Sequence, residues 1–219
     1  MSELSFPDGE SLADLATYVR RAARLDEDGA IRLQVAGSVL AAWVCVLPGS
    51  GLLRSGLVLG LRTMPVDPAG QEQGVDVTVP LAGVADRFAR RAATGDASTR
   101  LSVPPTTVAP SWAALSAPRG GWEPVRTVSV AGLLEVAREG IAEVTRGAPE
   151  GSGSSAVASL RARVWGREVD GVPAGAALAV HALGFVGADD PAVAPPATVH
   201  RSGAWLRVST SAGHVILRP

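Results

Sequence analysis

The feature that most constrains the fold is a series of short segments in which apolar residues recur at every second position. Residues 31–35 read Ile-Arg-Leu-Gln-Val, and the same alternation returns at 57–61 and 75–79. A period of two places alternate side chains on one face of a β-strand. The run 39–47 is apolar on both faces, as expected of a central strand. With the turn-forming residues 48–51 and similar short breaks, the pattern predicts an antiparallel meander.

Other segments carry apolar residues at helical spacing and predict about four helices. These segments are 11–24, 81–92, 130–146 and 174–186. Ser11, with Asp14 three residues later, is expected to cap the first helix. The last helix is apolar nearly all round, which predicts that it is buried. Residues 125–129, residues 157–165 and the C-terminal residues are expected to be strands. The chain is therefore predicted to be an α+β protein with a largely antiparallel sheet.

The chain is expected to form two halves that share one core. Residues 1–103 hold a helix, the meander and a second helix, and residues 122–219 hold a strand–helix pair, the buried helix and a C-terminal hairpin. Between them, residues 104–121 form a Pro-rich connector. The strand 39–47 and the helix 174–186 both need apolar cover on more than one side, so each half can bury the surplus apolar surface of the other.

Two internal similarities suggest a duplication. Residues 79–86 resemble residues 128–135, and both segments lie where a predicted strand leads into a helix. A helix followed by a hairpin occurs at 11–47 and again at 174–218. One interpretation is an old duplication that gave two similar lobes, and the other is chance similarity in a chain rich in Ala, Val and Gly.

The absence of lysine excludes several classes of enzyme. All 20 basic residues are arginine. Enzymes that form a lysine Schiff base, including those with covalent pyridoxal phosphate, need a reactive lysine. The phosphate-binding P-loop and the protein-kinase core also depend on lysine. We find no dinucleotide-binding motif and expect no cofactor.

The residues that usually bind metal are few and scattered. Cys45 is the single cysteine and lies in an apolar run, so it is expected to be buried and unreactive. His181, His200 and His214 have no second histidine or cysteine at ligand spacing. His181 is expected to be a core histidine, whereas His200 and His214 are expected to lie near each other on the terminal strands. No metal site is predicted.

No convergent catalytic set is recognisable, and the remaining polar candidates are arginine and tryptophan. The segment 151–155 contains serines between glycines but does not match a nucleophile elbow. Residues 147–155 are instead expected to be a mobile linker. Arginine beside tryptophan can bind carboxylate, phosphate or a protein hot spot. The residues that fit this description are Arg54, Arg62, Arg119, Trp122, Trp165 and Arg167. The alternative is that these are surface arginines beside anchoring tryptophans, and no site residue is assigned.

Charge and hydropathy indicate the class of partner. A formal net charge of −1 gives no field that would gather nucleic acid or anionic lipid. The first residues do not resemble a signal peptide and no segment is a membrane span, so a cytoplasmic protein is expected. In its Ala/Arg/Val-rich, lysine-free composition the chain resembles conserved proteins of unknown function from GC-rich actinobacteria. That resemblance implies no activity.

Two functions follow as hypotheses. The first is a non-enzymatic protein that binds another protein or a second copy of itself. The second is an enzyme or sensor for a small anionic ligand bound through arginines. Convergence of Arg54, Arg62, Arg119 or Arg167 with a histidine in a deep cleft would favour the second, and tryptophans lining a flat apolar patch would favour the first.

Overall fold

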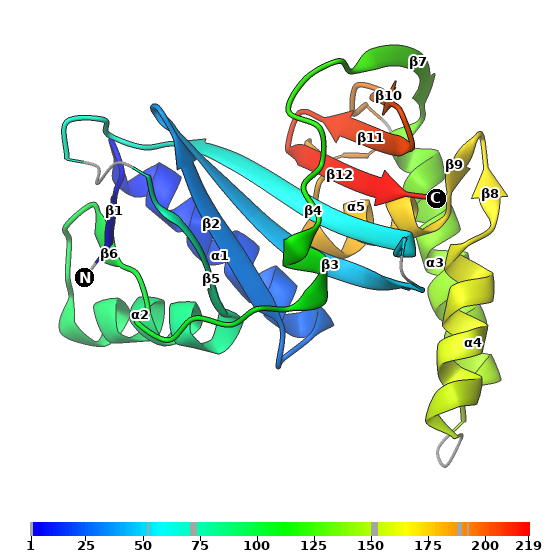
Figure 1. Ribbon diagram of the computed structural model, residues 1–219, viewed down its shortest axis with the longest axis horizontal. Coiled ribbons are helices and arrows are strands. Elements are labelled where there is room, and N and C mark those ends of the chain that lie inside the picture. Colours follow the sequence, from blue (N-terminus) through cyan, green and yellow to red (C-terminus); the bar gives the residue numbers. More distant parts are fainter. Residues whose placement is uncertain (1, 52, 71–73, 150–152, 188–189, 192) are drawn as a thin grey trace. The chain divides into compact units, whose positions relative to one another are not determined.

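The alternating segments of the first half form the antiparallel strands that the sequence predicts (Figure 1). The computed structural model describes residues 2–51, 53–70, 74–149, 153–187, 190–191 and 193–219. It divides into two units. Unit 1 comprises Met1–Cys45 and Leu61–Ser116, and unit 2 comprises Val46–Gly60 and Ala117–Pro219. The protein is α+β with a largely antiparallel sheet, as predicted.

Unit 1 is built on a sheet in the order β5-β2-β3-β4. The strands are β2 (Ala30–Ala36), β3 (Val39–Ser50), β4 (Ser55–Pro65) and β5 (Asp76–Pro80). Ile31 lies opposite Val44 on one side and Val79 on the other, and all three side chains are buried. The period of two therefore places the predicted apolar residues in a ladder across three strands, which is how an antiparallel sheet builds a core face.

Two α-helices, a small sheet and a 3₁₀-helix, η1 (Ser111–Ala114), complete the described part of unit 1. The helices α1 (Gly9–Leu25) and α2 (Leu81–Thr94) pack against each other, and β1 (Glu3–Ser5) pairs with β6 (Arg100–Ser102). The predicted cap of the first helix is wrong, because the helix begins two residues earlier. Asp8 is the N-cap, and its carboxylate accepts a hydrogen bond of 2.7 Å from the backbone N–H of Ser11. Asp14 instead pairs with Arg62 of β4 at 2.7 Å.

Unit 2 contains a sheet in the order β4-β12-β11-β10-β7 and three α-helices. Its strands are β7 (Glu123–Val128), β10 (Ala197–Ser202), β11 (Trp205–Thr210) and β12 (Gly213–Arg218), with a small hairpin of β8 (Glu168–Val169) and β9 (Val172–Pro173). Its helices are α3 (Val130–Gly147), α4 (Ser154–Trp165) and α5 (Gly175–Leu183). As predicted, α5 is buried on nearly every side, and it packs against α3 and β12.

The prediction of a strand at 157–165 is wrong, because these residues form most of α4. Leu160 and Val164 are buried, and their spacing of four residues matches one turn of a helix. The segment therefore satisfied both periods, and packing of α4 against α3 selects the helical one. Residues 150–152 of the expected mobile linker lie outside the described residues. Gly147 ends α3 and Ser154 begins α4, so the helices occupy both ends of that segment.

The two units contain the same parts in a different chain order. In unit 1 a helix leads into the meander β2-β3-β4, and β5 pairs with β2 and then leads into α2. In unit 2, α5 leads into the meander β10-β11-β12, and β7 pairs with β10 and leads, through Ser129, into α3. The internal similarity between 79–86 and 128–135 lies at the two equivalent strand-to-helix junctions. This correspondence fits an internal duplication.

Two burial predictions are wrong. In β3 the buried row consists of Leu40, Ala42, Val44 and Val46, whereas Cys45 belongs to the other row and is half-buried. An apolar run therefore does not guarantee burial on both faces. His181 is exposed although it stands on α5, because it occupies the one face of that helix that is not covered.

Candidate functional site

A cavity of about 680 Å³ opens in unit 2, and the described residues that line it all belong to that unit. Its walls come from the tip of the β3–β4 hairpin, from α4, from the segment around β8 and β9, and from the ends of β10, β11 and β12. The apolar lining residues include Leu47, Leu57, Val58, Trp165 and Leu217. A concave, mainly apolar site of this volume falls in the range of ligand pockets, which is about 300–1,000 Å³.

The hairpin tip takes its shape from residues in the left-handed backbone region. Gly49 has a φ of 66°, and a Cβ there would lie 2.6 Å from the carbonyl oxygen of Arg54. Arg54 has a φ of 55°, and its carbonyl accepts a hydrogen bond of 3.0 Å from the N–H of Leu57. Only glycine occupies such a position without steric cost, so Gly49 allows the two strands to approach closely beside the cavity.

Trp165 forms part of the cavity wall and is only 4% exposed. Its ring lies against Gly140 of α3, where a Cβ would stand 2.6 Å from the Cη2 atom of the indole. On the same side of the fold, a Cβ on Gly175 would lie 2.9 Å from Val58. Gly140 therefore lets the Trp165 ring contact α3, and Gly175 lets Val58 of β4 contact α5, and these contacts shape the cavity wall.

The turn between β8 and β9 is held by an arginine from β7. Asp170 and Gly171 have φ values of 49° and 75°, the combination that a type I′ hairpin turn requires. The Arg126 guanidinium lies over Gly171, and its Nη1 donates a hydrogen bond of 3.0 Å to the carbonyl oxygen of Asp170. Since Gly171 also lines the cavity, Arg126 helps to position that wall.

The charged residues at the cavity are mostly basic. Arg161, Arg201 and Arg218 line it, together with one acidic side chain, Glu168. Arg218 lies over the ring of Trp205 at 5.5 Å. None of these three arginines takes part in the ion pairs found among the described residues. Their charge is therefore available to a ligand.

The arginines suggested by the sequence do not converge on this cavity. Arg62 pairs with Asp14, and Arg167 donates to Glu143 at 2.6 Å. Arg119 is exposed, and Arg54 supports the hairpin tip through its backbone. Of the residues singled out from sequence, only Trp165 lines the cavity, and no histidine or cysteine is among the described lining residues. The arginines that do line it come from α4 and from strand ends, which linear spacing does not reveal.

The tryptophan–arginine pairs also differ from those suggested by the sequence. Arg207 lies over Trp122, with 4.8 Å between its Cζ and the ring centroid. His200 stands directly opposite Arg207 across β10 and β11. Burial lowers the pKa of His200, and the charge of Arg207 lowers it further. His214 lies opposite Ser209 instead, so the two strand histidines are not partners.

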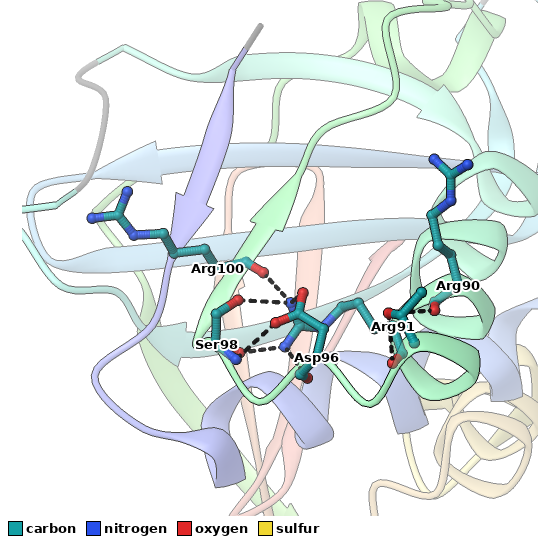
Figure 2. A network of polar contacts seen from close by, with 6 residues as sticks. Arg90, Arg91, Asp96, Ser98 and Arg100 are labelled. Atoms are coloured by element: carbon teal, nitrogen blue, oxygen red, sulfur yellow. Dashed lines mark hydrogen bonds and ion pairs between the residues drawn. The ribbon is translucent and has the colours of Figure 1, made fainter.

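A second polar network, in unit 1, is structural (Figure 2). Arg91 of α2 donates from Nη1 to the Asp96 carboxylate at 2.7 Å, to the Ser98 hydroxyl at 3.1 Å and to the Arg100 carbonyl at 2.6 Å. Its Nη2 donates to the carbonyls of Asp96 and Ser98. The guanidinium thus satisfies the turn that follows the helix, and its donors are occupied by the protein.

The hydroxyls of Ser50 and Ser55 are present, but no histidine stands beside them in the described lining to act as a base. Among the described residues, no group of three His, Cys, Asp or Glu side chains is placed to hold a metal ion. No helix in the described part of the chain is long and apolar enough to cross a membrane.

Two family models match successive parts of the chain. The model of a family described as "Domain of unknown function (DUF8010)" matches residues 1–114, and that of "Domain of unknown function (DUF8185)" matches residues 117–219. Among the curated proteins, none matches the sequence.

Two solved structures resemble this chain in fold. The DNA polymerase III subunit beta from Pseudomonas aeruginosa is 11% identical, with a TM-score of 0.50 over 94% of this chain and 62% of that one. The sliding clamp from Bartonella birtlesii, solved with griselimycin, is 10% identical, with a TM-score of 0.51 over 99% of this chain and 64% of that one. The chain therefore spans less than two thirds of these proteins' length. The likeness shows a sliding-clamp-like fold.

Proposed function

For this chain, which belongs to the family described as a domain of unknown function, DUF8010, we propose a non-enzymatic role as a protein-interaction module. The cavity of unit 2 is the proposed docking site, and its occupant is a short segment of a partner protein. The observation that carries the proposal is the combination of an apolar wall with three arginines that take no part in the ion pairs among the described residues.

The apolar wall supports a segment with large hydrophobic side chains. Leu47 is half-buried, and Pro48 and Ala162 are exposed, so these lining residues offer apolar surface to a ligand. An apolar anchor that enters such a pocket buries area worth about 25 cal/mol per Å². Interfaces typically derive most of their affinity from a few anchors of this kind.

The basic rim supports an acidic residue in the same segment. Arg161, Arg201 and Arg218 outnumber Glu168, so the lining carries an excess of positive charge. Complementary charges at the edge of an interface accelerate association and select partners. We therefore expect a partner segment that combines apolar anchors with Asp or Glu. Nucleic acid stays outside the proposal because the formal net charge of the chain is −1.

The comparisons add support of a different kind. Both similar structures are described as subunits of DNA polymerase III, which is to say proteins that work within an assembly. A fold that serves in assemblies is consistent with an interaction role, although fold alone does not assign function.

The test is selection of random dodecamer peptides on the purified protein, followed by affinity measurements on matched variants. Ala162 lines the cavity from α4, whereas Ala156 is exposed on the same helix and does not line it. Ala162→Trp fills the cavity and should weaken selected peptides at least about tenfold, which corresponds to about 1.4 kcal/mol. Ala156→Trp should leave their affinity unchanged.

The same experiment can also refute the docking proposal. If no peptide is enriched on the wild-type protein, or if both tryptophan variants bind selected peptides equally, the docking proposal is wrong. A small anionic ligand remains the second hypothesis because three arginines line the cavity. It predicts that a metabolite carboxylate or phosphate raises the melting temperature, and that replacing Arg161 and Arg201 with Gln removes the effect.

A further inference from the structure

A cluster of polar side chains with unpaired buried atoms lies on the strands of unit 2, outside the cavity. Along β10 and β11, Val199 and Val208 are fully buried, and the alternation turns His200 and Arg207 to the opposite face of the sheet. Trp122 covers Arg207 from the segment that precedes β7. These three residues form the Arg207 cluster, and none of them lines the cavity.

The geometry of the cluster places the Arg207 guanidinium over the indole ring of Trp122. Trp122 donates its indole N–H to the carbonyl oxygen of Pro118 at 3.0 Å, which holds the ring in place. The Cζ atom of Arg207 lies over that ring, 4.8 Å from its centroid. A guanidinium in such a cation–π contact still has N–H groups that can donate to a ligand.

The polar groups of the cluster lack partners. Arg207 Nε and His200 Nδ1 are buried and make no hydrogen bond within the described part of the chain. Arg207 is also absent from the ion pairs among these residues. By contrast, the partly buried Arg32, Arg62 and Arg91, with side chains 22%, 24% and 14% exposed, each have a carboxylate at 2.7 Å.

A guanidinium partly withdrawn from water without a counter-charge is costly. Burial lowers the pKa of Arg207, and no acidic group opposes that effect. The fold thus holds a cation whose hydration is reduced and whose charge is not compensated. Arrangements that lower stability in this way occur typically at functional sites.

We propose that the Arg207 cluster binds an oxyanion, the carboxylate or phosphate group of a ligand, at the outer edge of the Arg207 guanidinium, formed by Nη1 and Nη2, because Nε is buried. Two parallel N–H···O bonds in the plane of the guanidinium are the geometry that arginine offers to either group. The bound anion supplies the missing counter-charge. The proposal is independent of the docking cavity, because no residue is shared.

The experiment follows the side-chain Nε–Hε signals of ¹⁵N-arginine-labelled protein by NMR during titration with inorganic phosphate, acetate or chloride. Phosphate or acetate should shift the Arg207 signal saturably, and chloride at equal ionic strength should not. A response to phosphate alone assigns the site to phosphate groups, and a response to both extends it to carboxylates. Arg207→Gln should remove the saturable response, and Arg207→Lys should weaken it about tenfold because lysine lacks the planar fork. Arg138→Gln, at an exposed position on α3, is the matched control.

A stability measurement separates this role from a structural one. In buffer without phosphate or carboxylate, Arg207→Met should melt at the same temperature as wild type or higher. With phosphate, the melting temperature should rise for wild type and stay constant for the variant. The proposal is overturned if no saturable shift occurs, if Arg207→Gln responds like wild type, or if Arg207→Met melts lower in anion-free buffer.

Discussion

Two glycines of α3 should respond in opposite directions to the same substitution, because only one of them is covered by Trp165. At Gly140, a Cβ would lie 2.6 Å from Trp165 Cη2, in a wall where the tryptophan is 4% exposed. At Gly132, a Cβ would lie 3.5 Å from the Cβ of Ser129, which is ordinary van der Waals contact. Gly→Ala within a helix gains up to about 1 kcal/mol from helix propensity. Gly132→Ala should therefore stabilise the protein.

For Gly140→Ala, the steric cost of placing a methyl group against the Trp165 ring exceeds the stability gained from the higher helix propensity of alanine. Inserting a methyl group into a filled core costs about 1–3 kcal/mol, so the net effect should be a destabilisation of about 1 kcal/mol. For a chain of this length that corresponds to a fall of about 2–4 °C in melting temperature. Urea unfolding followed by circular dichroism and tryptophan fluorescence measures both variants.

A double-mutant cycle ties the effect to the contact. In the Trp165→Leu background the obstructing ring is gone, so Gly140→Ala should turn neutral or stabilising. If Gly140→Ala stabilises the wild-type protein as much as Gly132→Ala does, Trp165 does not rest on α3 in solution, and the described cavity wall is wrong.

Three further predictions follow. Fragments 1–103 and 122–219 should aggregate or stay molten when they are expressed separately. The reason is that residues 46–60 belong to unit 2 but lie in the first fragment. A dispersed NMR spectrum from either fragment would refute this prediction. The hydrogen bonds from Arg167 hold the pKa of Glu143 below its ordinary value of 4.5, so the stabilisation from this pair is present above pH 4.5 and is lost as the pH falls through the folded pKa; carbon-detected NMR titration should give a pKa below 4.5 that returns toward 4.5 in Arg167→Gln. Purified protein should contain no stoichiometric metal by elemental analysis, since the histidines are scattered and there is one cysteine, and stoichiometric zinc or iron would contradict the prediction.

The elements that the sequence predicted well are those in which one period fits and the other does not. The alternation at 31–35 and 75–79 became β2 and β5, and the helical spacing at 130–146 became α3. The prediction of a strand at 157–165 failed because, in so short a segment, the spacing of Leu160 and Val164 fits both the period of a strand and that of a helix. Neighbouring residues cannot decide such a case, and contact with α3 does.

The candidate site was less accessible to sequence reasoning than the fold. Trp165 was singled out for its neighbour Arg167, yet the structure turns Arg167 to Glu143 and places Trp165 in the cavity wall. Arg201 and Arg218 lie on separate strands and meet at the cavity only through the pairing of β10, β11 and β12. No local pattern marks residues that long-range register brings together.

The sequence by itself determined the α+β class, the antiparallel meander, the buried helix α5 and the exclusion of lysine-dependent chemistry. These follow from periodicity and composition, which act over a few residues or over the whole chain. Only the tertiary structure decided that Cys45 is half-buried, that His181 is exposed and that Arg207 lies over Trp122 without an ion pair to any described carboxylate. The physical reason is that burial and charge pairing depend on which surfaces meet across the sheet, and that is set by strand order and register.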